Sequence, residues 1–199
     1  GKSTLFKLLT GQQAPPTGGR RDGAQVGMAR VPDPRLDALS ALFKPEKTTP
    51  ATVRYVDAPG IPEEHRREAA FNLPELGAAD VLLIVLRAFA DDAVAHPMGA
   101  VDPLRDLGFV EEEFILQDQL VIERRLERLA RDIAKRKSPE LLREQELLGR
   151  CLAVCERPAP LRGEMLSADE LKILRGFTFL SLKPMLVVLN VGERELAGD

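Results

Sequence analysis

The chain has 199 residues, of which 44% are hydrophobic and 30% are charged, a composition that excludes a disordered chain and allows one good core. Its 28 basic and 31 acidic residues leave a formal net charge of −3, so the chain as a whole does not attract nucleic acid, and we expect no DNA partner. No run of about 18 apolar residues occurs, so we expect no membrane-spanning helix and no membrane partner.

The chain opens on Gly1-Lys2-Ser3, the last part of the phosphate-binding motif G-x-x-x-x-G-K-[ST]. Leucines at helical spacing predict a helix over 4–10, which Gly11 ends. In this motif, backbone N–H groups cradle phosphates, the Lys ammonium reaches the outer phosphates and the Ser hydroxyl ligates Mg²⁺. The alternative is an accidental helix start. We interpret the chain as a fragment that begins inside the motif.

Residues 12–23 are rich in Pro and Gly, which favours a surface loop. The segment "VGMARV" then predicts a short strand, and Asp33-Pro34 predicts the start of a helix. Four apolar side chains line one side of this helix: Leu36, Leu39, Leu42 and Phe43.

Three further segments predict buried strands of a parallel sheet: "TVRYV" before Asp57, "DVLLIVLRAF" from Asp80, and "PMLVVLN" ending at Asn190. Helical patterns separate these apolar runs. The expected fold class is therefore α/β, with a doubly wound, mostly parallel sheet.

Between Phe109 and Pro158 the pattern changes to that of paired helices. One apolar seam consists of Ile122, Leu126, Leu129 and Ile133, and a second, after the helix start at Ser138-Pro139, of Leu141, Leu148, Leu152 and Cys155. These seams predict an antiparallel, coiled-coil-like helical hairpin. A further helix is expected after the capping box that begins at Ser167.

The only two cysteines, Cys151 and Cys155, are four residues apart in this helical stretch. This spacing is a poor disulfide framework and fits a reducing compartment, so we expect a cytoplasmic protein. The two residues are interpreted as small apolar side chains on one helix face, with a metal or redox role as the alternative.

Two segments supply partners for the phosphate loop. Asp57-Ala58-Pro59-Gly60 follows a strand, where P-loop enzymes place a carboxylate for Mg²⁺ and a glycine N–H facing the γ-phosphate. An ordinary turn is the alternative, but ligands of open α/β sheets bind beyond the carboxyl ends of the strands, where this segment falls. Asn190-Val191-Gly192-Glu193 ends another strand at the same edge. Guanine-specific enzymes of this class carry N-K-x-D there, so Val191 and Glu193 weaken the fit to guanine.

Two other features of the sequence bear on function. His96 lies in a loop expected at the ligand edge, where it either positions the attacking water or is a solvated loop histidine. A basic cluster along the hairpin either is a solvated helix face or binds RNA phosphates, and it consists of Arg124, Arg125, Arg128, Arg131, Lys135, Arg136 and Lys137.

Taken together, several segments resemble the Obg-like ATPase (YchF-type) family of translation-factor-class P-loop proteins, in order and over nearly all of the chain. These segments are "GKSTLFKLLTG", "VPDPRLDAL", "TVRYVDAPG", "AVDPLRDL", "VIERRLERL" and "KPMLVVLNVGE". The resemblance implies a P-loop domain over 1–108 and 159–199, interrupted by a helical hairpin over 109–158, and a downstream domain of TGS type. It also implies ATP hydrolysis coupled to ribosome association and an N-x-x-E element that goes with ATP at least as well as GTP. His96 matches a histidine in the corresponding segment of the family.

The resemblance assigns nucleotide contacts to Gly1, Lys2, Ser3, Thr4, Gly60, Asn190, Val191 and Glu193, and Mg²⁺ contacts to Ser3 and Asp57. The chain departs from the family in both switch loops. Arg21 stands nearest the place of the family's Mg²⁺-sensing Thr, with Thr17 at the wrong spacing, and the segment after Gly60 is short and helical in character.

Three functions follow as hypotheses. The first is a Mg²⁺-dependent NTPase that binds ATP or GTP, prefers ATP, and acts on the ribosome or ribosomal RNA. The second is a nucleotide-binding regulatory or scaffold protein with little hydrolysis, since Ile61 follows Gly60 where many related GTPases carry Gln. A small-molecule kinase is disfavoured, because nothing after Asp57 indicates an acceptor site. His65 is assigned to the surface.

Overall fold

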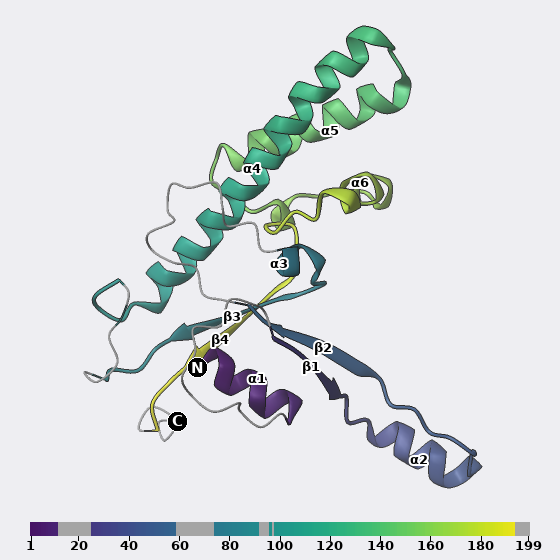
Figure 1. Ribbon diagram of the computed structural model, residues 1–199, viewed down its shortest axis with the longest axis vertical. Helices are drawn as coiled ribbons and strands as arrows, with labels where there is room; N and C mark the ends of the chain where they lie inside the picture. Colours follow the sequence, from purple (N-terminus) through teal and green to yellow (C-terminus); the bar gives the residue numbers. More distant parts are fainter. Residues whose placement is uncertain (12–24, 59–73, 92–95, 97, 194–199) are drawn as a thin grey trace. The chain divides into compact units, whose positions relative to one another are not determined.

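The computed structural model describes residues 1–11, 25–58, 74–91, 96 and 98–193. These residues belong to two compact units, 1–60 and 61–199, which are described separately below (Figure 1). No helix among the described residues combines the length and the apolar character needed to cross a membrane.

The first unit combines two helices with a two-stranded antiparallel sheet. Its elements are α1 (Lys2–Thr10), β1 (Gln25–Arg30), α2 (Pro34–Phe43) and β2 (Thr52–Asp57). The two strands pair from Gln25 opposite Asp57 to Arg30 opposite Thr52. Gly11 ends α1 with φ +66°, and the Asp33 carboxylate caps α2 by accepting the Arg35 N–H, so both predicted helix boundaries are confirmed.

Helix α1 packs closely on this sheet because β1 carries a glycine beneath it. A Cβ at Gly27 would lie 2.5 Å from Thr10 Cγ2 and 2.9 Å from Phe6 Cζ, both far inside van der Waals contact. Phe6 is buried in this contact, and the Thr10 hydroxyl donates to the Phe6 carbonyl at 2.8 Å. The helix therefore lies against both strands, with its first turn near the end of β2.

The second unit contains a parallel strand pair and a group of helices. Its elements are α3 (Pro74–Ala78), β3 (Leu82–Arg87), α4 (Pro103–Lys135), α5 (Pro139–Cys155), η2 (Leu161–Gly163), α6 (Ala168–Leu174), η3 (Arg175–Phe177) and β4 (Met185–Asn190). Strands β3 and β4 pair in parallel, from Leu82 opposite Met185 to Arg87 opposite Asn190.

Helices α4 and α5 lie side by side and are joined by three residues (Figure 1). The predicted seams meet in one core, where Ile122, Leu129 and Leu148 have no exposed surface. Arg125 on α4 donates two hydrogen bonds, of 2.7 and 2.8 Å, to the Glu144 carboxylate on α5. We call α4 and α5 the helix pair; its role as an insertion into a P-loop domain stays a prediction.

A buried carboxylate lies where this helical core meets the core of the sheet. Asp118, in the middle of α4, is 2% exposed and accepts the backbone N–H groups of Leu180 and Ser181 at 2.8 and 2.7 Å. Phe179 belongs to the core around the helix pair, whereas Leu180 packs with Phe114 and Leu82 beside the strands. Asp118 thus fixes the short segment that passes from one core to the other.

The structure departs from the sequence expectations at several places. The strand Thr52–Asp57 is confirmed, but its described partner is β1, antiparallel, and the described strands form two separate two-stranded sheets. Thr52 and Arg54 place polar groups in β2, so it is not apolar on both faces. The first hairpin helix begins at Pro103 rather than near Phe109, because the Asp102 carboxylate caps it. On α2, the expected apolar side is largely exposed, at 53% for Leu39, 72% for Leu42 and 73% for Phe43.

We predict that Asp118 makes stability depend on pH. Burial raises the pKa of its carboxyl from 3.8 to about 6, against the lowering effect of the two hydrogen bonds and of the Lys183 charge. The folded state therefore binds this proton more tightly than the unfolded chain. Its contribution is fully present below pH 3.8 and is lost as the pH rises through about 6.

Asp118→Asn removes this titration. Relative to the variant, the free energy of unfolding of the wild type should fall by about 2.4 kcal/mol between pH 4 and pH 7. Urea unfolding at a series of pH values measures this difference. Parallel curves for the two proteins would contradict it.

Candidate functional site

The first turn of α1 reaches the carboxyl end of β2. The Lys2 ammonium donates a hydrogen bond to the carbonyl oxygen of Ala58, the residue that follows β2. Gly1 precedes the helix as its N-cap, and the Gly1 carbonyl accepts the first helical hydrogen bond from Leu5, at 2.9 Å. The unpaired N–H groups of this turn make the start of α1 a favourable place for an anion.

Asp57, the last residue of β2, supplies a carboxylate close to this lysine. Lys2 is an exposed residue, but its ammonium turns inward, and desolvation lowers its pKa while the Asp57 charge acts to raise it. The Asp57 Oδ1 atom is buried and has no hydrogen-bond partner among the described residues. A buried carboxylate oxygen without a partner is costly, and a bound cation would remove that cost.

The groups around Asp57 fit Mg²⁺. Ser3 is half-buried in the first turn of α1 and offers a hydroxyl, so the two predicted ligands are both hard oxygen donors. Within the described ranges, no three His, Cys, Asp or Glu side chains gather as a possible metal site. Mg²⁺ needs no such group, since it usually binds through one or two protein oxygens together with waters and phosphates.

The second unit carries the predicted base-reading residues at the end of its parallel strands. Asn190 ends β4 opposite Arg87 of β3, and its carbonyl accepts the Ala88 N–H at 2.8 Å. Val191 and Gly192 are half-buried, while Glu193 is exposed. The parallel pairing of β3 and β4 places this segment beyond the carboxyl ends of the strands, as expected.

Arg87 is an organising residue that the sequence reasoning did not single out. Its guanidinium donates to the carbonyls of Phe89 and Asp91, at 3.0 and 2.9 Å, and lies 4.7 Å from the centre of the Phe89 ring. These contacts hold the turn after β3. The predicted strand ended at Phe89, whereas β3 ends at Arg87, and an arginine in an apolar run was the available signal.

His96 packs against the beginning of α4. Its Nε2 atom lies 3.0 Å from Asp106 Oδ2, and the two side chains are only 8% and 14% exposed. Its Nδ1 atom accepts the Met98 N–H at 3.2 Å. The interpretation as a solvated loop histidine is therefore wrong for this structure, while the role in positioning water stays a prediction.

The structure thus groups the predicted residues in two sets. Gly1, Lys2, Ser3, Thr4 and Asp57 lie in the first unit, and His96, Asn190, Val191 and Glu193 lie in the second. Five residues singled out from the sequence lie outside the described residues: Thr17, Arg21, Gly60, Ile61 and His65.

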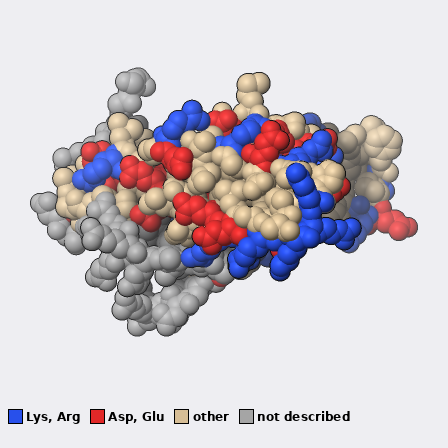
Figure 2. All heavy atoms as spheres, turned by 90° about the horizontal axis from the view of Figure 1, so that it is seen from above, with Lys and Arg blue, Asp and Glu red and all other residues tan. Residues whose placement is uncertain are grey.

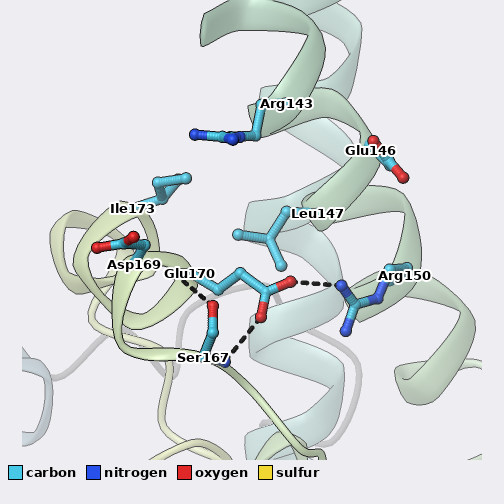
Figure 3. A pocket seen from close by; sticks show the side chains of 8 residues that line it. All are labelled: Arg143, Glu146, Leu147, Arg150, Ser167, Asp169, Glu170 and Ile173. Carbon is cyan, nitrogen blue, oxygen red and sulfur yellow. Dashed lines mark hydrogen bonds and ion pairs between the residues drawn. The ribbon is translucent and has the colours of Figure 1, made fainter.

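A hollow of about 310 Å³ between α5 and α6 is distinct from both sets (Figure 3). Two of the charges in its walls are paired with each other, since Glu170 binds Arg150, and Glu170 also accepts the Ser167 N–H at 2.7 Å. The second bond belongs to the predicted capping box, which is confirmed. None of the predicted nucleotide or metal residues lines this hollow.

Comparison with known proteins gives related sequences over almost the whole chain. The chain is 33% identical over 202 residues to "Ribosome-binding ATPase YchF" of Bacillus subtilis and 30% identical over 202 residues to "Obg-like ATPase 1" of Pongo abelii. The alignments cover 99% and 98% of the chain. The chain is a homologue of the YchF and Obg-like ATPase proteins.

The fold agrees with this relationship. The YchF GTPase structure of Schizosaccharomyces pombe matches with a TM-score of 0.74 and 25% identity, over 98% of this chain and 55% of that one. No family model matches the chain. The chain spans 55% of the length of the Bacillus YchF protein and 51% of the Pongo Obg-like ATPase. The resemblance to the YchF-type family is therefore confirmed for the part that the chain represents.

We predict that the two cysteines of this YchF homologue are chemically inert in the folded state. Both are buried in the core of the helix pair and unpaired, as expected for small apolar residues. Burial raises the pKa of Cys151 to about 11 and that of Cys155 to about 12, so almost no thiolate is present at pH 8. A thiol reagent at pH 8 should label both residues rapidly in urea and neither in native buffer. Rapid labelling of the native protein would contradict the prediction.

Proposed function

We propose that the chain forms the nucleotide-binding part of a Mg²⁺-dependent NTPase that prefers ATP and acts on the ribosome in the cytoplasm. The observation that supports this most directly is the approach of Lys2 to the end of β2, beside an Asp57 oxygen that has no partner in the described part of the chain. The relatives named as ATPase and GTPase support hydrolysis, and those named as ribosome-binding support the partner.

The residues of the first unit have distinct roles in this proposal. The backbone N–H groups of Gly1 to Thr4 bind phosphate oxygens, and the Lys2 ammonium attracts the outer phosphates. Ser3 and Asp57 hold Mg²⁺, which would neutralise charge on the transferred phosphoryl group. The N–H of Gly60, a residue outside the described ranges, is assigned to the γ-phosphate.

Selectivity for adenine is assigned to the end of β4. Asn190 and Val191 contact the base, and Glu193 stands where guanine-specific enzymes use Asp. Its extra methylene moves the carboxylate away from the position that accepts two guanine N–H groups. Adenine lacks that donor pair and loses nothing by the change.

The RNA partner is assigned to the far half of α4. Arg124, Arg128, Arg131 and Lys135 are exposed and recur at intervals of three or four residues, which places them on one helix face. Arg125 is not in this set, because it is bound to Glu144. Figure 2 shows that Lys and Arg side chains gather on part of the surface seen from above and alternate with acidic groups elsewhere. The regular spacing of the four cationic side chains along α4 suits binding to the phosphates of ribosomal RNA.

A second function is a nucleotide-dependent scaffold with little hydrolysis that acts through the helix pair. The engagement of both His96 ring nitrogens favours it, because neither nitrogen is free to orient water in this arrangement. Single-turnover hydrolysis with and without ribosomes separates the two. Stimulation by ribosomes supports the NTPase, and its absence supports the scaffold.

We predict that Lys2→Ala and Asp57→Asn act on different parts of nucleotide binding. Lys2→Ala should weaken ATP binding about 100-fold with or without Mg²⁺, because a charge-assisted contact is lost. Asp57→Asn should weaken it only when Mg²⁺ is present. Calorimetry with ATP and GTP, with Mg²⁺ or EDTA, measures both effects.

Lys7→Ala is the matched control, since Lys7 lies on α1 beyond the first turn and should leave affinity unchanged. Equal losses for Lys2→Ala and Lys7→Ala would contradict the phosphate site. Strong preference of the wild type for GTP would contradict the assignment of Glu193.

We also predict that the cationic face of α4 controls the salt dependence of RNA binding. Replacing Arg124, Arg128, Arg131 and Lys135 together by Gln should reduce the slope of log K against log salt by about 3. Filter binding of ribosomal RNA at several salt concentrations measures the slope. Replacing the exposed Arg157 and Lys172, which form ion pairs elsewhere, is the control and should change it little. An unchanged slope in the fourfold variant would place the RNA contact elsewhere.

A further inference from the structure

The contact between His96 and Asp106 identifies a positioning residue near the start of α4. Asp106 lies in the first turn of that helix, and its Oδ2 atom is 3.0 Å from His96 Nε2. The low exposure of both side chains, 8% and 14%, makes this hydrogen bond stronger than a surface pair.

The partners of the ring fix which nitrogen carries the proton. A backbone N–H can only donate, so His96 Nδ1, which meets the Met98 N–H at 3.2 Å, must offer its lone pair. A carboxylate can only accept, so Nε2 must carry the hydrogen that is given to Asp106. The geometry therefore selects one neutral tautomer, with hydrogen on Nε2 and a lone pair on Nδ1.

A second contact fixes the Asp106 carboxylate itself. Its other oxygen, Oδ1, accepts from the Arg105 guanidinium at 3.1 and 2.8 Å. Arg105 also donates to the Ala100 carbonyl at 2.7 Å, which ties it to the turn after His96. That turn is closed by the Gly99 N–H on the His96 carbonyl at 3.0 Å. Each carboxylate oxygen thus has its own partner, and the group cannot rotate without breaking one contact.

We propose that Asp106 positions His96 by holding the ring in its Nε2–H form, which leaves Nδ1 as the only acceptor for a water O–H. This inference rests on the proposed NTPase function and on the predicted role of His96 in orienting the attacking water. The Met98 contact at 3.2 Å is at the long end for a hydrogen bond and is the one that water replaces. The Asp106 contact is kept, so Nδ1 stays unprotonated and accepts the water O–H.

Asp106→Asn tests the proposal because Arg105 determines how the amide points. The guanidinium requires an oxygen, so the Asn carbonyl faces Arg105 and the NH₂ group faces His96 Nε2. Nε2 must then accept, and the hydrogen moves to Nδ1, where it opposes the Met98 N–H. Adding Arg105→Ala frees the amide to turn over, which restores an acceptor for Nε2.

The ring tautomer is read by ¹⁵N NMR of the full chain, with His65→Gln used to assign the signals of the two histidines. We expect the Nε2–H form in the wild type and in Arg105→Ala, the Nδ1–H form in Asp106→Asn, and recovery of Nε2–H in the double variant. The kcat for ATP should fall roughly 10- to 100-fold in Asp106→Asn with little change in KM. It should recover partly in the double variant.

The outcomes separate this inference from the proposed function. An Nδ1–H ring in the wild type, or a ring unchanged by Asp106→Asn, would overturn the role of Asp106. If Asp106→Asn switches the ring while neither it nor His96→Ala changes hydrolysis, the positioning by Asp106 stands and the hydrolytic role of His96 is overturned.

Discussion

The second unit depends on one buried carboxylate. Asp118 receives two backbone N–H groups from the segment that leads into β4, and this segment contributes Phe179 to one core and Leu180 to the other. The same segment is held from three further sides. The Leu161 N–H donates to the Ser181 hydroxyl at 3.2 Å. The Lys183 ammonium donates to the carbonyls of Gly77 and Ala79. The Leu82 N–H donates to the Pro184 carbonyl. Burying the Asp118 charge destabilises the fold unless its hydrogen bonds are kept. The carboxylate therefore favours this one arrangement of the segment, at a cost in free energy.

Helices whose boundaries and packing faces depend on residues close together in the sequence could be predicted from it. Asp33, Asp102 and Ser138 each precede a Pro and accept a backbone N–H of the first helical turn, although the cap at Asp102 was overlooked. The apolar spacing of α4 and α5 predicted their shared core, because side chains three and four residues apart lie on one helix face. Lys2 and Asp57 could be assigned because Lys2 lies at the start of a recognisable helix and Asp57 at the end of a recognisable strand.

Contacts between distant residues could not be predicted in this way. Asp118 and Leu180 are 62 residues apart, and no local pattern distinguishes Asp118 from the other acids of a charged helix. Asp106 and Arg105 likewise resemble an ordinary acidic and basic pair in the first turn of a helix. The antiparallel partner of β2 was missed because the apolar length of a strand does not show the direction of its neighbour.

The uninterrupted course of α4 has a mechanical consequence. Its 33 residues form one helix of about 50 Å, whose first half packs on β3 and whose second half pairs with α5. After Pro103 and Gly108 it contains no proline or glycine, the residues at which helices bend. It is therefore a stiff lever with its fulcrum at the sheet. A tilt of about one degree at the fulcrum moves the far end by about 0.6 Å, so small rearrangements near β3 are amplified where Lys135 lies.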